Sequence, residues 1–101
     1  MKRPTSARTK LAARELGEYI TTWRKLRDLT MQQLAERANT SRSTITKLEH
    51  GDPTISFEVF LNACGTLGVL DRVKEAVDPY ETDLGRIRAD QELPQRVRNK
   101  A

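Results

Sequence analysis

The sequence predicts an all-α fold. Apolar residues recur at spacings of three and four through most of its length, which is the period of a helix with one buried face. No stretch alternates apolar and polar residues as a half-buried strand would. Short groups that contain Asn, Gly or Pro separate the helical stretches. Together these features indicate five helices, with room for one more short helix near the C-terminus.

Length and composition restrict the class of protein. A chain of 101 residues, 37% of them hydrophobic, can bury one modest core but not two. The single cysteine, Cys64, excludes an internal disulfide and a multi-cysteine metal site, and its place on an apolar face predicts a core residue. The apolar runs are too short to cross a membrane, and the start MKRPTSARTK lacks the apolar segment of a secretory signal. We therefore expect a cytoplasmic protein with no membrane partner.

The first helix is predicted over residues 16–29. Its apolar residues have the spacing of one buried stripe: Leu16, Tyr19, Ile20, Trp23, Leu26 and Leu29. The preceding run LAARE is rich in good helix formers and allows the helix to begin as early as Ser6. Residues 1–14 are therefore either a basic N-terminal arm or an extension of this helix.

Helices two and three are short and closely spaced. Thr30 and Gln33 fit a capping box, in which each residue bonds the backbone of the other, so helix two is predicted over residues 31–38. Ser41 is a suitable N-cap for helix three, predicted over residues 42–49. The run HGDP then ends helix three.

Two further helices follow. Ser56 is a suitable N-cap for helix four, whose apolar stripe consists of Phe57, Phe60, Leu61, Cys64 and Leu67. Helix five is predicted over residues 70–77 and ends at the Asp-Pro pair that follows. These helices place the folded domain at residues 15–78. Residues 79–101 form a polar, partly disordered extension with room for a short helix over residues 83–92.

Charge is distributed unevenly along the chain. Residues 1–14 carry five basic side chains and no acid, and residues 24–47 carry six basic side chains against two acids. Residues 49–85 hold eight acids against two basic side chains. The basic front half suits a polyanion, which favours nucleic acid over a membrane surface, with added solubility as the alternative explanation.

The join between helices two and three has a specific geometry. Only three residues separate the helices, so they must cross steeply, as in a helix-turn-helix. That arrangement needs a small residue at the contact, here Ala35, and a turn residue that accepts positive φ, here Asn39. It also needs buried aliphatic residues on the second helix, here Ile45 and Leu48.

Because Ile45 and Leu48 face inward, the polar side chains of helix three are predicted to project outward. Thr44 is predicted at the margin of this outward face. Arg side chains on such a helix pair bidentately with guanine in a major groove, and hydroxyls donate to or accept from base edges. The alternative is an ordinary solvated helix face. The predicted base-reading residues are Arg42, Ser43, Thr44, Thr46 and Lys47.

The run LGEYITTWRKLRDLTMQQLAERANTSRSTITKLEHG resembles the Cro/C1-type (XRE) helix-turn-helix family, whose usual form reads close to "LG..I...R...gLTQ..LA...gvs...is..E.G". The resemblance extends over residues 16–70. It implies a compact five-helix bundle of the lambda-repressor-like DNA-binding type, without a cofactor. It also implies a homodimer on an inverted-repeat operator, associated with the nucleoid when bound. Arg42, Ser43 and Lys47 stand on the positions that usually read bases.

Contacts to the DNA backbone are predicted around the start of helix two. The family commonly has Gln at the position of Met31, where it engages a phosphate, and methionine cannot make that hydrogen bond. Neighbouring side chains and backbone amides would then hold the phosphate. The predicted phosphate-contacting residues are Thr30, Gln32, Gln33, Ser41, Arg24 and Lys25.

The C-terminal half of the chain has features that predict binding to other protein chains. Apolar residues remain near the end of the bundle, at Leu67, Leu70, Val73 and Val77, and are predicted to pair across a two-fold axis. The runs TLGVLDRVKEAVDP and QRVRNK resemble the HipB-like antitoxin branch of the family. This second resemblance implies an antitoxin that represses its own toxin-antitoxin operon and binds a HipA-like kinase toxin. The alternatives are a stand-alone Cro/C1-type repressor without a toxin partner, and an antitoxin that acts only by blocking its partner.

No enzyme chemistry is predicted. His50 is the only histidine and suits a loop or capping role. The acids of residues 71–83 lack the loop pattern that calcium needs, so they predict a solvated or partner-facing surface without a metal. The chain has no Gly-rich phosphate loop.

Overall fold

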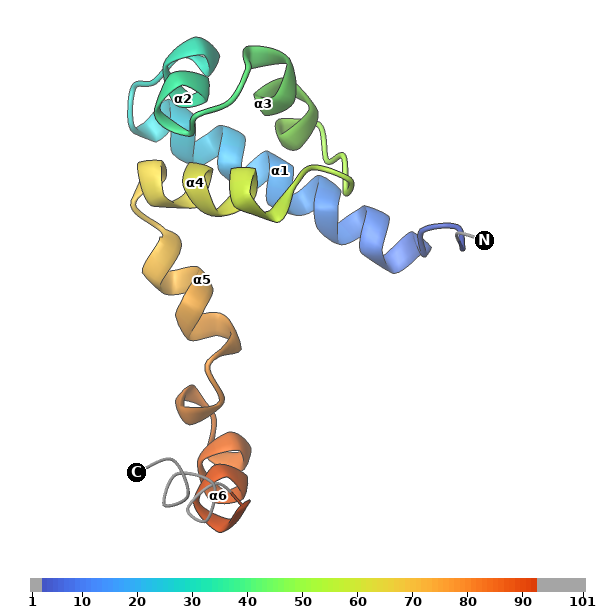
Figure 1. Ribbon diagram of the computed structural model, residues 1–101, viewed down its shortest axis with the longest axis vertical. Helices are drawn as coiled ribbons and strands as arrows, with labels where there is room; N and C mark the ends of the chain where they lie inside the picture. Colours follow the sequence, from blue (N-terminus) through green and yellow to red (C-terminus); the bar gives the residue numbers. More distant parts are fainter. Residues whose placement is uncertain (1–2, 93–101) are drawn as a thin grey trace. The chain divides into compact units, whose positions relative to one another are not determined.

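The computed structural model describes residues 3–92, and all regular structure in that range is helical (Figure 1). Its elements are α1 (Ala7–Leu26), α2 (Met31–Arg37), α3 (Arg42–Glu49), α4 (Phe57–Leu67), α5 (Leu70–Val77), the 3-10 turn η1 (Pro79–Glu81) and α6 (Asp83–Glu92). The chain divides into two compact units, the first ending at Leu70 and the second beginning at Asp71. The predicted all-α fold is confirmed. The predicted C-terminal extension of residues 79–101 is described as far as Glu92, and its residues 93–101 lie outside the described range.

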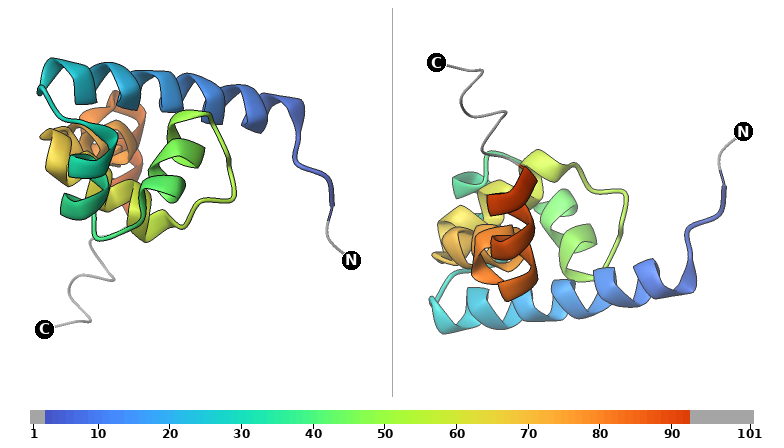
Figure 2. Two further views of the ribbon diagram at one scale, coloured as in Figure 1. Left: turned by 90° about the horizontal axis from the view of Figure 1, so that it is seen from above. Right: turned by 90° about the horizontal axis from the view of Figure 1, so that it is seen from below.

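The first unit is a bundle in which α1 packs against α3 and α4, and α2 packs against the same two helices. Figure 2 shows α1 along one side of this bundle, with its N-terminal turns extending past α3. Leu34, Ala35 and Ile45 have no solvent exposure at the centre of the core. Other core side chains are Ile20, Ala38, Leu48, Ala63 and Leu67.

Helix α1 begins at Ala7, in agreement with the helix extension that the sequence offered, and it ends earlier than the sequence indicated. Ser6 caps it, because the Ser6 hydroxyl oxygen accepts a hydrogen bond from the Thr9 amide at 3.2 Å. Residues 7–14 are therefore helical and not a flexible arm. The helix ends at Leu26, three residues before the predicted end, because Asp28 adopts a left-handed backbone with φ of 56°.

The buried face of α1 also differs from the predicted stripe. Gly17, Ile20 and Arg24 are its buried residues. Leu16 and Tyr19, which the apolar spacing assigned to the core, are 47% and 57% exposed. The helix is turned this way because a Cβ on Gly17 would lie only 2.6 Å from the carbonyl oxygen of Glu49 and 2.7 Å from that of Leu48. Glycine thus permits a close crossing of α1 over the end of α3.

This crossing predicts the effect of one added methyl group. We expect Gly17→Ala to lower the free energy of unfolding by roughly 1 to 3 kcal/mol, because backbone atoms must move to admit the Cβ. Chemical denaturation followed by circular dichroism measures this change. Gly65→Ala in α4 is the matched control, since its Cβ would meet only the Leu70 side chain at 3.8 Å. Equal stabilities for the two variants would contradict the close crossing.

The predicted helix caps are confirmed. Thr30 and Gln33 form the complete capping box of α2, and the hydroxyl oxygens of Ser41 and Ser56 accept hydrogen bonds from backbone amides at the starts of α3 and α4. Asn39 has the predicted positive φ, at 58°. These local bonds set the N-terminal boundaries of α2, α3 and α4.

The second unit, in its described residues 71–92, is held together mainly by backbone and capping contacts. Ala89 is its one buried hydrophobic residue in that range. Gly85 lies so close to Pro79 that a Cβ on it would lie 2.0 Å from the Pro79 carbonyl oxygen, which fixes η1 against the start of α6. Arg86 donates to the carbonyl of Tyr80 at 2.5 Å and pairs with Asp83.

The compact first unit ends at Leu70, the first residue of α5, whereas the sequence placed the end of the folded domain at residue 78. Helix α5 spans the predicted residues but contributes no buried side chain. Leu67, in contrast, is fully buried in the first unit. Leu67 cannot contribute to the dimer surface that the sequence suggested for this end of the bundle.

Candidate nucleic-acid interface

The helix pair α2 and α3 has the arrangement that the sequence predicted. The two helices pack against each other across the turn at residues 38–41 (Figure 1). Ala35 on α2 and Ile45 on α3 are both fully buried at this join. Leu48 is 7% exposed and seats the last turn of α3 on the rest of the bundle. The opposite face of α3 is thereby held toward solvent on a rigid support.

Three of the predicted base-reading side chains lie on that solvent face. Arg42, Ser43 and Lys47 are all exposed, at the first, second and sixth positions of α3. Thr44 is half-buried, and its hydroxyl lies 3.0 Å from that of the capping residue Ser41. The structure thus brings a guanidinium, a hydroxyl and an ammonium together on one helix face.

Thr46 does not project outward as predicted. It is half-buried, and its hydroxyl lies 3.0 Å from the carbonyl of Arg42 and 3.6 Å from the sulfur of Met31. The side chain is therefore turned along its own helix and toward α2. The Thr46 hydroxyl thus connects α3 to Met31 of α2, and Thr46 does not lie on the solvent face with Arg42, Ser43 and Lys47.

Met31 also faces the interior. It is partly buried against the hydrophobic core, at the first position of α2. A phosphate at the start of α2 would meet Thr30, Gln32 and Gln33, which are exposed around it.

The hydrogen-bonding capacity of these residues is partly used. Gln33 accepts from the Thr30 amide at 2.9 Å through its amide oxygen, which leaves the Gln33 side-chain nitrogen as a donor. The Thr30 hydroxyl accepts from the Gln33 amide at 3.0 Å and keeps its own proton to donate. Gln32 donates to Glu36 at 3.2 Å. Exposed Lys25 and the capping residue Ser41 complete the set of predicted phosphate contacts on the surface.

Arg24 is the predicted phosphate contact that the structure places elsewhere. Its Nε donates to Oε2 of Glu49 at 2.7 Å, and its Nη2 donates to Oε1 of the same carboxylate at 3.2 Å. A third donor, Nη1, bonds the carbonyl of Leu29 at 3.0 Å. The side chains of Arg24 and Glu49 are only 11% and 3% exposed. Arg24 is thus a buried brace between α1 and the end of α3, not a surface cation.

Glu49 and its second partner were not singled out by the sequence. The hydroxyl of Thr21 lies 3.0 Å from Oε1 of Glu49, so the carboxylate is bonded by two side chains of α1. The sequence contained a sign of this network, because Gly17, Thr21 and Arg24 lie at helical spacings of four and three and therefore share one face of α1. The network fixes the C-terminal turn of the helix that carries Arg42 and Lys47.

The loop after α3 carries a defined negative charge. Hydrogen bonds from the Thr54 hydroxyl and amide hold the pKa of Asp52 below its ordinary value, with a further contribution from nearby Lys47. Asp52 is consequently ionised at neutral pH. His50 is the C-cap of α3 and is exposed, in agreement with a capping position.

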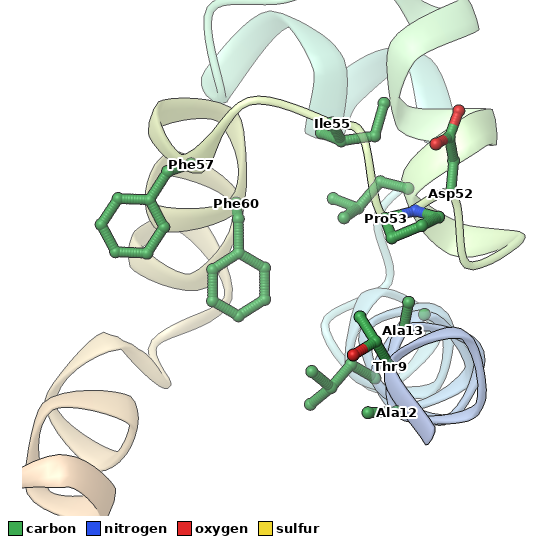
Figure 3. A pocket seen from close by; sticks show the side chains of 11 residues that line it. Thr9, Ala12, Ala13, Asp52, Pro53, Ile55, Phe57 and Phe60 are labelled. Atoms are coloured by element: carbon green, nitrogen blue, oxygen red, sulfur yellow. The ribbon is translucent and has the colours of Figure 1, made fainter. Parts of the chain in front are cut away.

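A groove of about 450 Å³ lies in the first unit, beside this loop. Figure 3 shows Phe57 and Phe60 of α4 on one side and Ala12 and Ala13 of α1 on the other. Leu48, in the last turn of α3, also lines it. Within residues 3–92, no group of three or more His, Cys, Asp or Glu side chains is placed to hold a metal ion. No helix in that range is long and apolar enough to cross a bilayer.

Comparison with known proteins gives one match. A family model described as helix-turn-helix matches residues 20–70, which is half of the chain and contains α2, α3 and α4. Neither the curated proteins nor the solved structures yield a match.

Proposed function

This chain belongs to the Cro/C1-type helix-turn-helix family of DNA-binding transcription regulators, and we propose that it is a sequence-specific repressor that reads bases through α3. The observation that carries this proposal is the exposed face of Arg42, Ser43 and Lys47 on a helix that Ile45 and Leu48 hold in the bundle. Arg42 would pair with a guanine, and Ser43 and Lys47 would contact neighbouring base edges. Thr44 lies at the margin of this face.

Backbone contacts would position the helix in the groove. Thr30, Gln32 and Gln33 surround the start of α2, and their remaining donors suit phosphate oxygens. Lys25 and Ser41 would add contacts on either side. Because these groups meet phosphates that every sequence carries, they contribute affinity without base preference.

The repressor would act as a homodimer. One short helix covers only a few base pairs, so adequate specificity needs two half-sites about 10 base pairs apart. Selection of duplexes from a random pool by the full chain, followed by footprinting, tests the proposal. We expect an inverted repeat with that spacing. Recovery of unrelated sequences, with equal protection on all of them, would contradict sequence-specific repression.

A finer proposal concerns the role of the second unit. We propose that the protein is an antitoxin that represses its own operon and binds a HipA-like kinase toxin. Three exposed side chains in η1 and α6, outside the first unit, support this proposal: Tyr80, Leu84 and Ile87 are 45%, 67% and 57% exposed. The alternative is a stand-alone repressor. A kinase-like protein encoded beside this gene, and its co-purification with the chain, would distinguish the two.

A further inference from the structure

The groove in the first unit exposes an unusual amount of apolar side chain. Phe57 is 72% exposed at its edge, and Leu16 on the opposite side is 47% exposed. In Figure 3 the Phe60 ring points toward the space between α4 and α1, and the Phe57 ring lies farther out on α4. Exposed apolar side chains along the edges of an apolar groove are typical of an interaction surface.

The position of Phe57 is fixed by local structure. Ser56 caps α4 by accepting from the Val59 amide at 3.2 Å, and Phe57 is therefore the first helical residue. Ile55 and Phe60, on either side of it in sequence, pack partly against the core. The backbone around Phe57 is thus held in place while its ring remains in solvent, as a preformed anchor requires.

The two walls of the groove carry opposite charges. On the α1 wall, exposed Arg8 and Lys10 flank the lining residue Thr9, and residues 3–14 contain no acid. On the α4 wall, exposed Glu58 follows Phe57, whereas Asp52 lines the groove from the loop that packs beside Ala13 of α1 (Figure 3). A second copy related by a two-fold axis along the groove would set the basic wall of each copy against the acidic wall of the other.

We propose that this groove is the contact surface between two copies of the chain, in which Phe57 of each copy packs against Ala12 and Leu16 of the other. The inference rests on the homodimer of the proposed function and names its surface. Arg8 and Lys10, counted in the sequence as part of a basic arm, would then face Glu58 of the second copy.

This surface also suits the geometry of DNA reading. Leu48 lines the groove and belongs to the last turn of α3, so the dimer contact lies next to the proposed recognition helix. Two copies joined here would hold their α3 helices on either side of one axis. Half-sites about one helical turn apart require such a close pair of recognition helices.

Sedimentation equilibrium of the full chain without DNA tests the proposal. We expect a dimer at micromolar concentration, and we expect Phe57→Glu to raise its dissociation constant at least about tenfold. The ring is in solvent in a single copy, so the variant should keep the helical content of the wild type by circular dichroism, and it should unfold at the wild-type temperature when both proteins are dilute enough to be monomeric. Leu26→Glu is the matched control, because Leu26 is also an apolar residue, 67% exposed, at the end of α1 outside the groove, and it receives the same charge. It should sediment as the wild type does.

Charge reversal tests the pairing of the walls. Arg8→Glu combined with Lys10→Glu should weaken the dimer, and adding Glu58→Lys should restore part of the loss. A wild-type monomer, or a Phe57→Glu protein that dimerises as the wild type does, would overturn the proposal.

DNA binding separates this inference from the proposed function. The Phe57→Glu monomer should still bind a single half-site with the wild-type base preference, while losing its tight binding to the full inverted repeat. If the wild type selects no sequence, the repressor proposal fails, and the sedimentation results still decide whether the groove is the dimer surface.

Discussion

Replacing Glu49 by Ala is expected to lower the free energy of unfolding by roughly 3 to 5 kcal/mol. The change removes the carboxylate that lies 2.7 Å from Nε of Arg24 and leaves the guanidinium buried with only the Leu29 carbonyl as a partner. Water cannot replace the lost bonds without opening the contact between α1 and α3. Urea denaturation followed by circular dichroism gives the change directly.

Two further variants show whether the loss in Glu49→Ala comes from the buried ion pair. Glu18→Ala removes an exposed acid from α1, the helix that carries Arg24, and should change stability by less than about 0.5 kcal/mol. Replacing both partners, Arg24→Met with Glu49→Leu, should cost much less than Glu49→Ala, because no buried charge is left without a partner. A Glu49→Ala protein within about 1 kcal/mol of the wild type would show that the pair does not brace the bundle.

Replacing Arg42 by Ala is expected to remove the base preference at one position in each half-site. Each lost bidentate contact costs about 1 to 3 kcal/mol, and the dimer loses two. The fold should be unaffected, because Arg42 is exposed at the first position of α3. Competition binding with duplexes that carry each of the four bases at every position of the half-site identifies the position that Arg42 reads.

Arg37→Ala is the matched control for this experiment. Arg37 is an exposed cation at the end of α2, outside the predicted contact set. Its loss should weaken binding to all duplexes by similar factors, if at all, and should leave the base preference unchanged. The assignment of the recognition face fails if Arg42→Ala behaves in the same way.

Several features of this protein were determined by short stretches of sequence. The capping residues Thr30, Ser41 and Ser56 set helix starts because each satisfies backbone amides within three residues. Asn39 could take the positive φ of the turn because its side chain tolerates that region. The spacing of Ala35, Ile45 and Leu48 then oriented α2 and α3, so the solvent face of Arg42, Ser43 and Lys47 followed from the sequence.

Only the tertiary structure decided which face of α1 is buried. The sequence offered two stripes at helical spacing, one apolar with Leu16 and Tyr19 and one with Gly17 and Arg24. The second is buried, because Gly17 allows the carbonyls of α3 to approach and Glu49 neutralises Arg24 across 25 positions of chain. The spacing of apolar residues along one helix cannot reveal that a glycine permits a close helix crossing, or that an acid far away in the sequence pairs with a buried arginine.

Packing between helices also decided that Phe57 is exposed and that the compact first unit ends at Leu70. Apolar spacing placed Phe57 in the core and α5 in the bundle, yet Phe57 is 72% exposed and α5 buries no side chain. Whether an apolar side chain is covered depends on which other elements reach it. Spacing along one helix predicts which residues share its apolar face. The packing of the other helices determines how much of that face is buried.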